Sequence, residues 1–430
     1  MHKITLLIAI FVSISTAMAQ PKSDSVLKNI LLKTSNDLVT QVLQNAGTYR
    51  LQIIYTQINR TRNNKPVFTN YYYNYDPNLY YNPASTVKMP LAFLALEKLH
   101  KMRLNGVNKY TIIQFDSSYE KQTIQYKDST SENQLPSIAH YIKKAFLISD
   151  NDAYNRIYQF TGQQTIHRSL VQKGYNDIRI PRQFMGFTTE QNRHTNPVRF
   201  IKANGSLIYA QPPAYNTDSF EFSRVVKIGK AYMNRNDSLV NEPFDFTVHN
   251  NISLEALQQI LQSVLFPASV PKKQRFDLSS EDYQFLFRYL SQYPSETSYP
   301  KYDDSIYYDS YVKFFFRDST HKMPDHVRVF NKVGWAYGFL TDVSYVADSK
   351  HNIEYMLSAT LYVNEDEVLN DNKYEYTTIG WPFLNQLGQR IYQYEIQRER
   401  KHKPDLSAFR VNYDKRDVND QRPSIKDADN

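Results

Sequence analysis

At residues 82–90 the chain carries the stretch NPASTVKMP, which places a serine hydroxyl (Ser85) three residues before a lysine amine (Lys88). The apolar residues that follow predict a helix beginning here, and positions i and i+3 of a helix lie on one face. A serine at its ordinary pKa is a poor nucleophile and needs a nearby base. A lysine can be that base only if burial or neighbouring positive charge keeps it neutral. The stretch therefore predicts a nucleophile and its base, although four-residue patterns with two fixed positions also occur by chance.

Two further short motifs follow. SDN at residues 149–151 lies between two predicted helices, and KVGW at residues 332–335 lies in an aromatic strand near the end of the sequence. Each has a plain structural interpretation, since Ser, Asp and Asn are preferred helix N-caps and a strand can expose one lysine. In this order, however, S-x-x-K opening a helix, S-D-N on a helix-connecting loop and K-[ST]-G on a late strand are typical of class A β-lactamases and penicillin-binding proteins.

The chain resembles this superfamily over roughly residues 24–398, and class A β-lactamases most closely. The resemblance implies that Ser85 is the nucleophile, which forms an acyl-enzyme with an amide or lactam carbonyl. Lys88 would be the base, or part of the proton relay, for acylation. Ser149 would pass a proton to the departing nitrogen, while Lys332 would hold Ser149 and lend positive charge. These four residues are the catalytic set that the resemblance predicts.

The same resemblance predicts the residues that bind substrate. Asn151 would donate a hydrogen bond to the substrate amide, and Gly334 would let the substrate backbone lie against the strand, because glycine has no Cβ. The backbone N–H groups of Ser85 and Trp335 would form the oxyanion hole, which is worth ~3 kcal/mol per donor in comparable sites. No metal and no organic cofactor is expected, since the histidines lack zinc-binding spacing and cysteine is absent.

Two departures from the family pattern concern the substrate carboxylate. Val333 replaces the hydroxyl residue of the third motif, and Asp342 stands about ten positions after Lys332, where the family often has an arginine. An acid there would repel a carboxylate, so we expect poor recognition of penicillin-type carboxylates. Thr341 and Tyr337 are the residues that could compensate.

Another departure concerns deacylation. Class A enzymes use a loop glutamate to activate the hydrolytic water. Residues 174–184 resemble the start of that loop, with Arg179 and Arg182 at its arginine positions, but the glutamate position falls on Phe184. Glu190 and Glu242 are candidates from elsewhere in the enlarged loop, and either could equally be a solvated loop acid. Without such a base the acyl-enzyme would persist, as it does in penicillin-binding proteins.

Hydrophobic periodicity places the elements. Helical spacing covers residues 24–46, 85–170, 254–265, 279–290 and 377–397, and strand patterns cover residues 50–57, 66–74, 326–333, 339–346 and 353–362. Residues 174–250 have weak periodicity and indicate a large insertion. With the resemblance, this order predicts an α+β fold of the β-lactamase and DD-peptidase type. An α/β sandwich lobe, whose antiparallel sheet is built from both chain ends, would face an all-helical lobe across a ligand cleft.

The two ends of the chain differ from the rest. Residues 1–19 predict a cleaved signal peptide, because a basic start precedes an apolar run and small residues at 17–19. An uncleaved anchor is the alternative, but the run is short for a bilayer. Residues 20–400 would form the hydrolase domain, and the polar, charge-mixed residues 401–430 are expected to be a disordered tail. We expect a secreted or periplasmic monomer that has no transmembrane segment after cleavage.

A net charge of +8, spread among acids, fits either attraction to anionic envelope polymers or a merely solvated surface, and export argues against nucleic acid as a partner. The sequence thus predicts an exported active-site-serine hydrolase of the class A β-lactamase family, acting through a Ser85 acyl-enzyme on a β-lactam or related amide. One alternative is a penicillin-binding-type acyl-transfer enzyme on peptidoglycan peptides. The other is a catalytically weak envelope-binding relative. The four predicted catalytic residues argue against the latter, whereas Val333 and Phe184 favour it.

Overall fold

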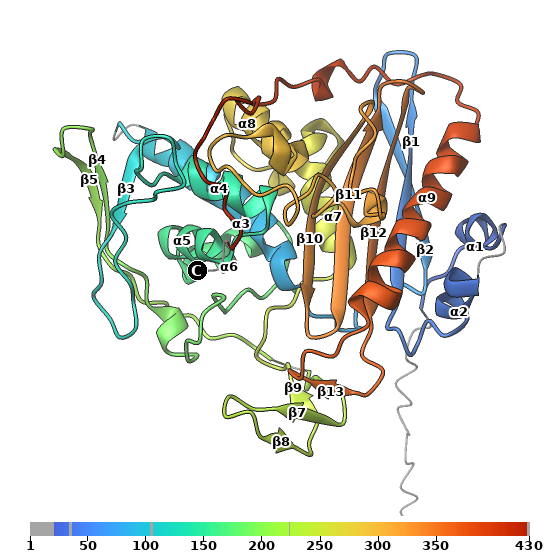
Figure 1. Cartoon of the computed structure of the whole chain (residues 1–430), viewed down its shortest axis with the longest axis horizontal. Coiled ribbons are helices and arrows are strands. Elements are labelled where there is room, and N and C mark those ends of the chain that lie inside the picture. The colour runs from blue at the N-terminus through green and yellow to red at the C-terminus, as the bar shows by residue number, and fades with distance from the viewer. Residues whose placement is uncertain (1–20, 34–36, 104–105, 223, 428–430) are drawn as a thin grey trace, which may run out of the picture.

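The computed structural model describes residues 21–33, 37–103, 106–222 and 224–427. The signal peptide predicted at residues 1–19 lies outside the described residues. A five-stranded sheet with helices on both faces stands beside a mainly helical lobe (Figure 1). Within the described ranges, no helix combines the length and the apolar character needed to cross a membrane.

The large sheet is antiparallel and takes its strands from both ends of the chain. They are β1 (Gln52–Arg60), β2 (Pro66–Tyr73), β10 (Val327–Ala336), β11 (Phe339–Asp348) and β12 (Ile353–Tyr362). Their order across the sheet is β10-β11-β12-β1-β2, so a C-terminal strand lies beside an N-terminal one at the β12–β1 pair. The predicted α+β fold, with its sheet built from both chain ends, is confirmed.

Helices cover both faces of this sheet. One face carries α1 (Ser25–Leu32), α2 (Asp37–Gln44) and α9 (Trp381–Gln397), and the other carries α7 (Leu254–Leu265) and α8 (Ser280–Ser291) (Figure 1). Side chains alternate across a strand, and β10 accordingly contributes to two cores. Phe330 packs against Phe287 of α8, whereas Val329 and Val333 pack on the α9 side. This alternation decides which residues of the Lys332 motif can reach the cleft.

The second lobe contains more than helices. It consists of α3 (Lys88–Met102), α4 (Ile138–Leu147), α5 (Asn151–Thr161) and α6 (Gln163–Gln172), with a small sheet of β3 (Ile112–Phe115), β4 (Val198–Ile201) and β5 (Leu207–Gln211) at its outer edge (Figure 1). The expectation that residues 85–170 are helical misses β3, because its partner β4 lies in the insertion and no local pattern marks the pairing.

Beyond β4 and β5, the insertion is built from still shorter strands. They are β6 (Lys227–Ile228), β7 (Ala231–Met233), β8 (Leu239–Val240) and β9 (Phe244–Asp245), and β7 also pairs with the distant β13 (Val368–Leu369). Strands of two or three residues are too short to give a detectable alternation of apolar and polar residues. Weak periodicity over residues 174–250 is the result.

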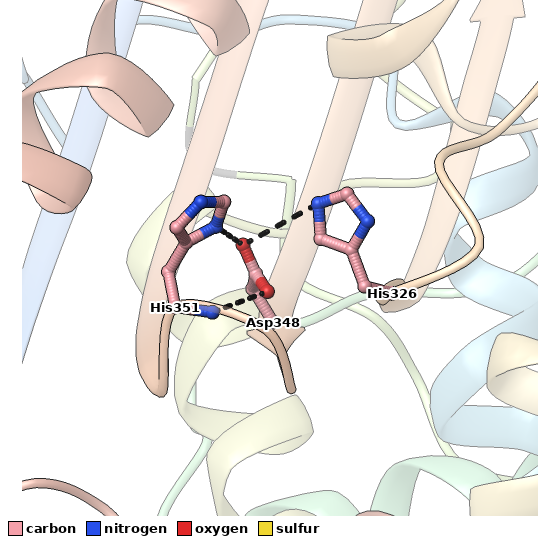
Figure 2. Close-up of side chains that lie close together, drawn as sticks. All are labelled: His326, Asp348 and His351. Carbon is pink, nitrogen blue, oxygen red and sulfur yellow. Dashed lines mark hydrogen bonds and ion pairs between the residues drawn. The ribbon is translucent and has the colours of Figure 1, made fainter.

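The turn between β11 and β12 is fixed by the buried carboxylate of Asp348 (Figure 2). Its Oδ2 accepts hydrogen bonds from His351 Nδ1 at 2.6 Å and from the Tyr392 hydroxyl of α9 at 2.7 Å, and its Oδ1 accepts from the backbone N–H groups of Lys350 and His351. His326 Nε2 lies 3.9 Å from the same Oδ2. Sequence spacing missed this grouping of metal-ligating residue types, which lie within 4.8 Å of one another. We describe it as a hydrogen-bond network, since both carboxylate oxygens already accept hydrogen bonds.

Residues 401–427, which the sequence predicted to belong to a disordered tail at 401–430, pack against the domain after α9. Leu406 and Phe409 are buried, and Arg416 donates to the carbonyls of Pro294 and Thr297 at 2.7 and 3.0 Å. The expectation of disorder came from the polar composition of this segment, which a few buried anchoring residues change little. Their burial depends on pockets formed by distant parts of the chain.

Candidate active site

Ser85 lies on a 3₁₀ turn, Ala84–Val87, that leads directly into α3. The predicted helix therefore begins as a tighter turn. Polar side chains brace it: Asn82 Oδ1 accepts from the Ala84 N–H at 2.8 Å, and Thr86 Oγ1 donates to the Pro83 carbonyl at 2.6 Å. Ser85 is half-buried, unlike its buried neighbours, and lines a cavity of about 500 Å³.

Lys88 connects the first motif to the second. Its side chain is completely buried, and Nζ lies 2.8 Å from Asn151 Oδ1 and 3.3 Å from Ser149 Oγ. The amine also donates to the Ser149 carbonyl. The start of α3 and the loop before α5 are thereby joined through one amine.

The SDN motif does two things at once. Asp150 is the N-cap of α5, with Oδ1 accepting from the Ala153 N–H at 2.7 Å and Oδ2 lying 3.4 Å from Lys144 Nζ. Ser149 before it has φ 70°, in the left-handed region. The motif therefore caps the helix and also places Ser149 and Asn151 in the cavity lining.

Lys332 reaches the same serine from β10. Its buried Nζ donates to Ser149 Oγ at 2.9 Å and to the Val333 carbonyl at 2.8 Å. Burial, reinforced by the positive charges of Lys88 and Lys313, holds the pKa of Lys332 well below the ordinary lysine value, although Asp342 opposes the shift. All three motifs thus meet at one hydroxyl flanked by two amines.

At Gly334, β10 lies against the nucleophile turn, the Ala84–Val87 turn that carries Ser85. A Cβ at this position would lie 2.6 Å from the Pro83 carbonyl oxygen and 2.9 Å from the Ser85 nitrogen. Glycine is therefore required by the turn itself, a reason that differs from the substrate contact expected from the sequence. Trp335 follows, lines the cavity and packs edge-on against Phe314.

Asp342 is not in the cleft, so the expected repulsion of a carboxylate is wrong. It pairs with Val333 in the β10–β11 register, and both side chains are buried on the α9 face of the sheet. Its oxygens accept hydrogen bonds from Asn331 at 2.8 Å, from Ser344 at 2.7 Å and from the Phe314 N–H at 3.0 Å. A carboxylate in the cavity would not meet this group.

The two residues expected to compensate behave differently. Thr341 is fully buried, donates to Thr360 at 2.9 Å and is not among the residues that line the cavity. Tyr337 does line the cavity.

Phe184 occupies the inner wall of the cavity. Asn155 brackets its backbone, accepting from the Phe184 N–H at 2.8 Å and donating to its carbonyl at 3.4 Å. The ring stacks on Tyr154 with centroids 4.2 Å apart, and its centroid lies 5.3 Å from Lys88 Nζ. An aromatic face thus stands beside the amine, at the position that the sequence resemblance aligned with the loop glutamate.

Neither alternative loop acid replaces it. Glu190 is exposed and lies 3.4 Å from His194, Glu242 is exposed, and neither lines the cavity. Their positions agree with the alternative interpretation of both residues as solvated loop acids. Among the described residues that line the cavity, the only carboxylate belongs to Asp150, which caps α5 and lies near Lys144.

Sequence reasoning missed a group of cavity residues from distant segments. Arg182, placed in the loop but given no binding role, donates from Nη1 to His249 Nε2 at 2.5 Å. Burial, followed by the charge of Arg182, lowers the pKa of His249 to about 3. Tyr307 and Tyr311 line the cavity as well. No short motif contains these residues, and only folding brings them together.

Comparison with known proteins agrees with the geometry. Residues 22–209 match the profile of the beta-lactamase enzyme family, and no curated protein matches the chain. Similar solved structures include the chromosome-encoded beta-lactamase of Vibrio parahaemolyticus (13% identity, TM-score 0.45, 83% of this chain and 97% of that one). Others are a beta lactamase from Xanthomonas campestris pv. campestris (11%, 0.47, 86% and 99%) and PBP-A (12%, 0.43, 87% and 98%). Residues 22–209, which contain the first two motifs, are thus similar to the beta-lactamase enzyme family, in agreement with the resemblance inferred from the sequence.

Proposed function

We propose that this protein is an exported active-site-serine enzyme whose Ser85 forms an acyl-enzyme with a β-lactam or related amide. One observation carries the proposal: Ser149 Oγ lies 2.9 Å from Lys332 Nζ and 3.3 Å from Lys88 Nζ, in the cavity that Ser85 lines. Two protonated amines around one hydroxyl would repel each other, which lowers the pKa of at least one of them. After burial, the positive charge of Lys88 is the next cause of the low Lys332 pKa, so the two amines compete for one proton, and the proposed reaction starts from the state in which Lys88 is the neutral amine.

In the proposed reaction, Ser85 Oγ bonds to the carbonyl carbon and its proton passes to the amine of Lys88. The backbone N–H groups of Ser85 and Trp335 stabilise the negative oxygen of the tetrahedral intermediate. The C–N bond then breaks as Ser149 protonates the departing nitrogen, and Lys88 returns a proton to Ser149. Asn151 orients the substrate amide, and Lys332 keeps the Ser149 hydroxyl in place.

A specific observation favours slow deacylation, and with it the penicillin-binding type of acyl transfer. Hydrolysis of an acyl-enzyme needs a base for water, and the described lining residues offer no carboxylate apart from Asp150. Phe184 instead presents its ring to Lys88. We infer that the acyl group stays on Ser85 until another acceptor takes it or water attacks slowly.

The test uses the chain without residues 1–19, as the intact protein and as Ser85→Ala, each incubated with benzylpenicillin while intact mass is followed. We expect an adduct that forms only when Ser85 is present and lasts for many minutes. Rapid loss of the adduct with product formation would assign the protein to efficient β-lactamases. No adduct, or an adduct also on Ser85→Ala, would refute the proposed β-lactam reaction.

A further inference from the structure

Arg182 places a guanidinium in the cavity without an acid beside it. Within the described part of the chain, no ion pair includes Arg182, and its guanidinium hydrogen bond goes to His249. Arg179, three residues earlier, differs: Asp177 lies 3.6 Å from it, and the same acid lies 3.2 Å from Arg224. Arg182 thus has no salt-bridge partner among the described residues, although the charge of Asp245 acts on its neighbour His249.

His249 positions this guanidinium without neutralising it. Its Nε2 accepts the hydrogen bond from Arg182, and its pKa of about 3, lowered first by burial, keeps the ring neutral near pH 7. Phe244, Phe246 and Tyr337 surround the imidazole with ring centroids 5.1–6.1 Å away. These three rings carry no negative charge, and the acid whose charge acts on His249 is Asp245.

The backbone of Arg182 is fixed as firmly as its side chain. Asn250 Oδ1 accepts from the Arg182 N–H at 3.1 Å, and the Tyr154 hydroxyl donates to the Arg182 carbonyl at 2.8 Å. Arginine presents a planar fork of N–H donors that matches a carboxylate with two hydrogen bonds. A guanidinium held in place beside a cavity is prepared for such a ligand, because little side-chain entropy remains to be lost.

We propose that Arg182, held by His249, binds a carboxylate of the substrate, so that the cavity selects anionic amides over neutral ones. This inference rests on the proposed acyl transfer at Ser85 and names the substrate class of the same cavity. Arg182 would also replace the carboxylate-binding hydroxyl that the third motif lacks, since Val333 stands at that position and is buried in the core on the α9 face. In this proposal the carboxylate is bound by Arg182 of the insertion loop and not by a residue of the strand next to β10.

Binding is tested in a Ser85→Ala background, where acylation cannot occur, with benzylpenicillin and its methyl ester as probes and calorimetry as the readout. We expect the acid to bind ~10- to 100-fold more tightly than the ester, as for a bidentate arginine–carboxylate pair. Arg182→Gln should abolish this preference. Arg179→Gln is the matched control on the same segment, and it should keep the preference because Arg179 does not line the cavity.

Two further variants distinguish a role of the Arg182–His249 pair in carboxylate binding from a purely structural role. His249→Gln keeps a hydrogen-bond acceptor and the guanidinium charge, so it should retain the acid preference, and Arg182→Lys should retain part of it. Melting temperature of each variant reports on the fold. The subsite is overturned if the parent binds acid and ester equally or binds neither, or if Arg182→Gln keeps the preference.

The proposed function is judged separately by acylation of Ser85 in the intact protein. Equal acylation rates for acid and ester would overturn the carboxylate subsite and leave the acyl-transfer proposal standing. Preference for the acid without any adduct on Ser85 would overturn acyl transfer and leave the subsite standing.

Discussion

Ser149 shows at the scale of one residue how local strain serves the site. A non-glycine residue in the left-handed region costs ~1–3 kcal/mol and persists only when its surroundings impose it. Here the imposing contacts are the amines of Lys88 and Lys332, which both reach Ser149 Oγ, together with the Asp150 cap that follows. The strained backbone aims the hydroxyl at both amines, which a regular helix start would not do.

Gly334→Ala should disable acylation while leaving the protein folded. The new Cβ would press on the backbone at Pro83 and Ser85, and a displacement of ~1 Å in a nucleophile can cost about 100-fold in rate. Intact-mass kinetics with benzylpenicillin measure the rate. Gly47→Ala is the control, since a Cβ there meets nothing within 4 Å, and it should react at the parent rate. An unchanged rate in Gly334→Ala would show that the turn tolerates the side chain.

Phe184→Glu should shorten the lifetime of the acyl-enzyme. It places a carboxylate on the backbone that Asn155 brackets, beside the amine of Lys88. A well-positioned general base accelerates a reaction about 10²–10⁴-fold. Because the position of the new carboxylate would not be optimised, we expect deacylation to become ~10-fold faster or more. Decay of the Ser85 adduct is followed by intact mass. Phe184→Gln has similar size without the base and should decay like the parent; equal decay of both variants would contradict the idea.

At the scale of elements, the register of β10 and β11 governs the site. Lys332 and Gly334 face the nucleophile turn, while Val333 and its partner Asp342 face the core on the α9 side. Alternation within one strand is readable from sequence, but the partner of each residue is not. Asp342 was therefore expected in the cleft, although the pairing places it on the opposite face.

Asp348→Asn should destabilise the β11–β12 turn in a pH-dependent way. Burial alone would raise the pKa of Asp348, but hydrogen bonds from His351, Tyr392 and two backbone N–H groups outweigh it and hold the pKa below the ordinary aspartate value. A carboxyl with a depressed folded-state pKa stabilises the fold above its unfolded pKa of about 4, and this contribution is lost as pH falls through the folded-state pKa.

We expect Asp348→Asn to cost about 1–3 kcal/mol at pH 7, as for a buried hydrogen-bonded charge, and progressively less as pH falls below ~4. Urea unfolding at several pH values measures the difference. The exposed turn residue Asp237 provides the control, since Asp237→Asn keeps a residue that tolerates its φ of 53°. A cost that does not depend on pH would contradict the assignment.

At the scale of the whole molecule, the C-terminal segment connects the sheet lobe with the region beside the cavity. Phe409 inserts among Phe287 and Tyr345 with ring centroids 5.4 and 4.7 Å away. Further on, Ile425 exchanges backbone hydrogen bonds with Lys301 and Asp303 at 2.8 and 3.0 Å. The segment that contains Lys301 and Asp303 leads to Tyr307, which lines the cavity. The C-terminal segment thus holds parts of the fold together that are distant in sequence.

Phe409→Ala should lower the free energy of unfolding by ~3–5 kcal/mol, because it removes a buried ring from an aromatic pocket. Urea unfolding monitored by circular dichroism measures the change. Val418→Ala, at a side chain 92% exposed on the same segment, should leave stability unchanged. If both variants were equally stable, the packing of the tail would contribute nothing to folding.

The sequence by itself determined the three motifs, the type and approximate bounds of most long elements, and the fold class, because helix and strand periods and S-x-x-K spacing are local properties of the chain. Tertiary structure alone decided what surrounds Ser85. The register turned Asp342 away, long-range pairing produced β3 and the small strands of the insertion, and folding brought Arg182 and His249 to the cavity. Contacts between distant segments depend on how whole elements pack, and no window of sequence contains both partners.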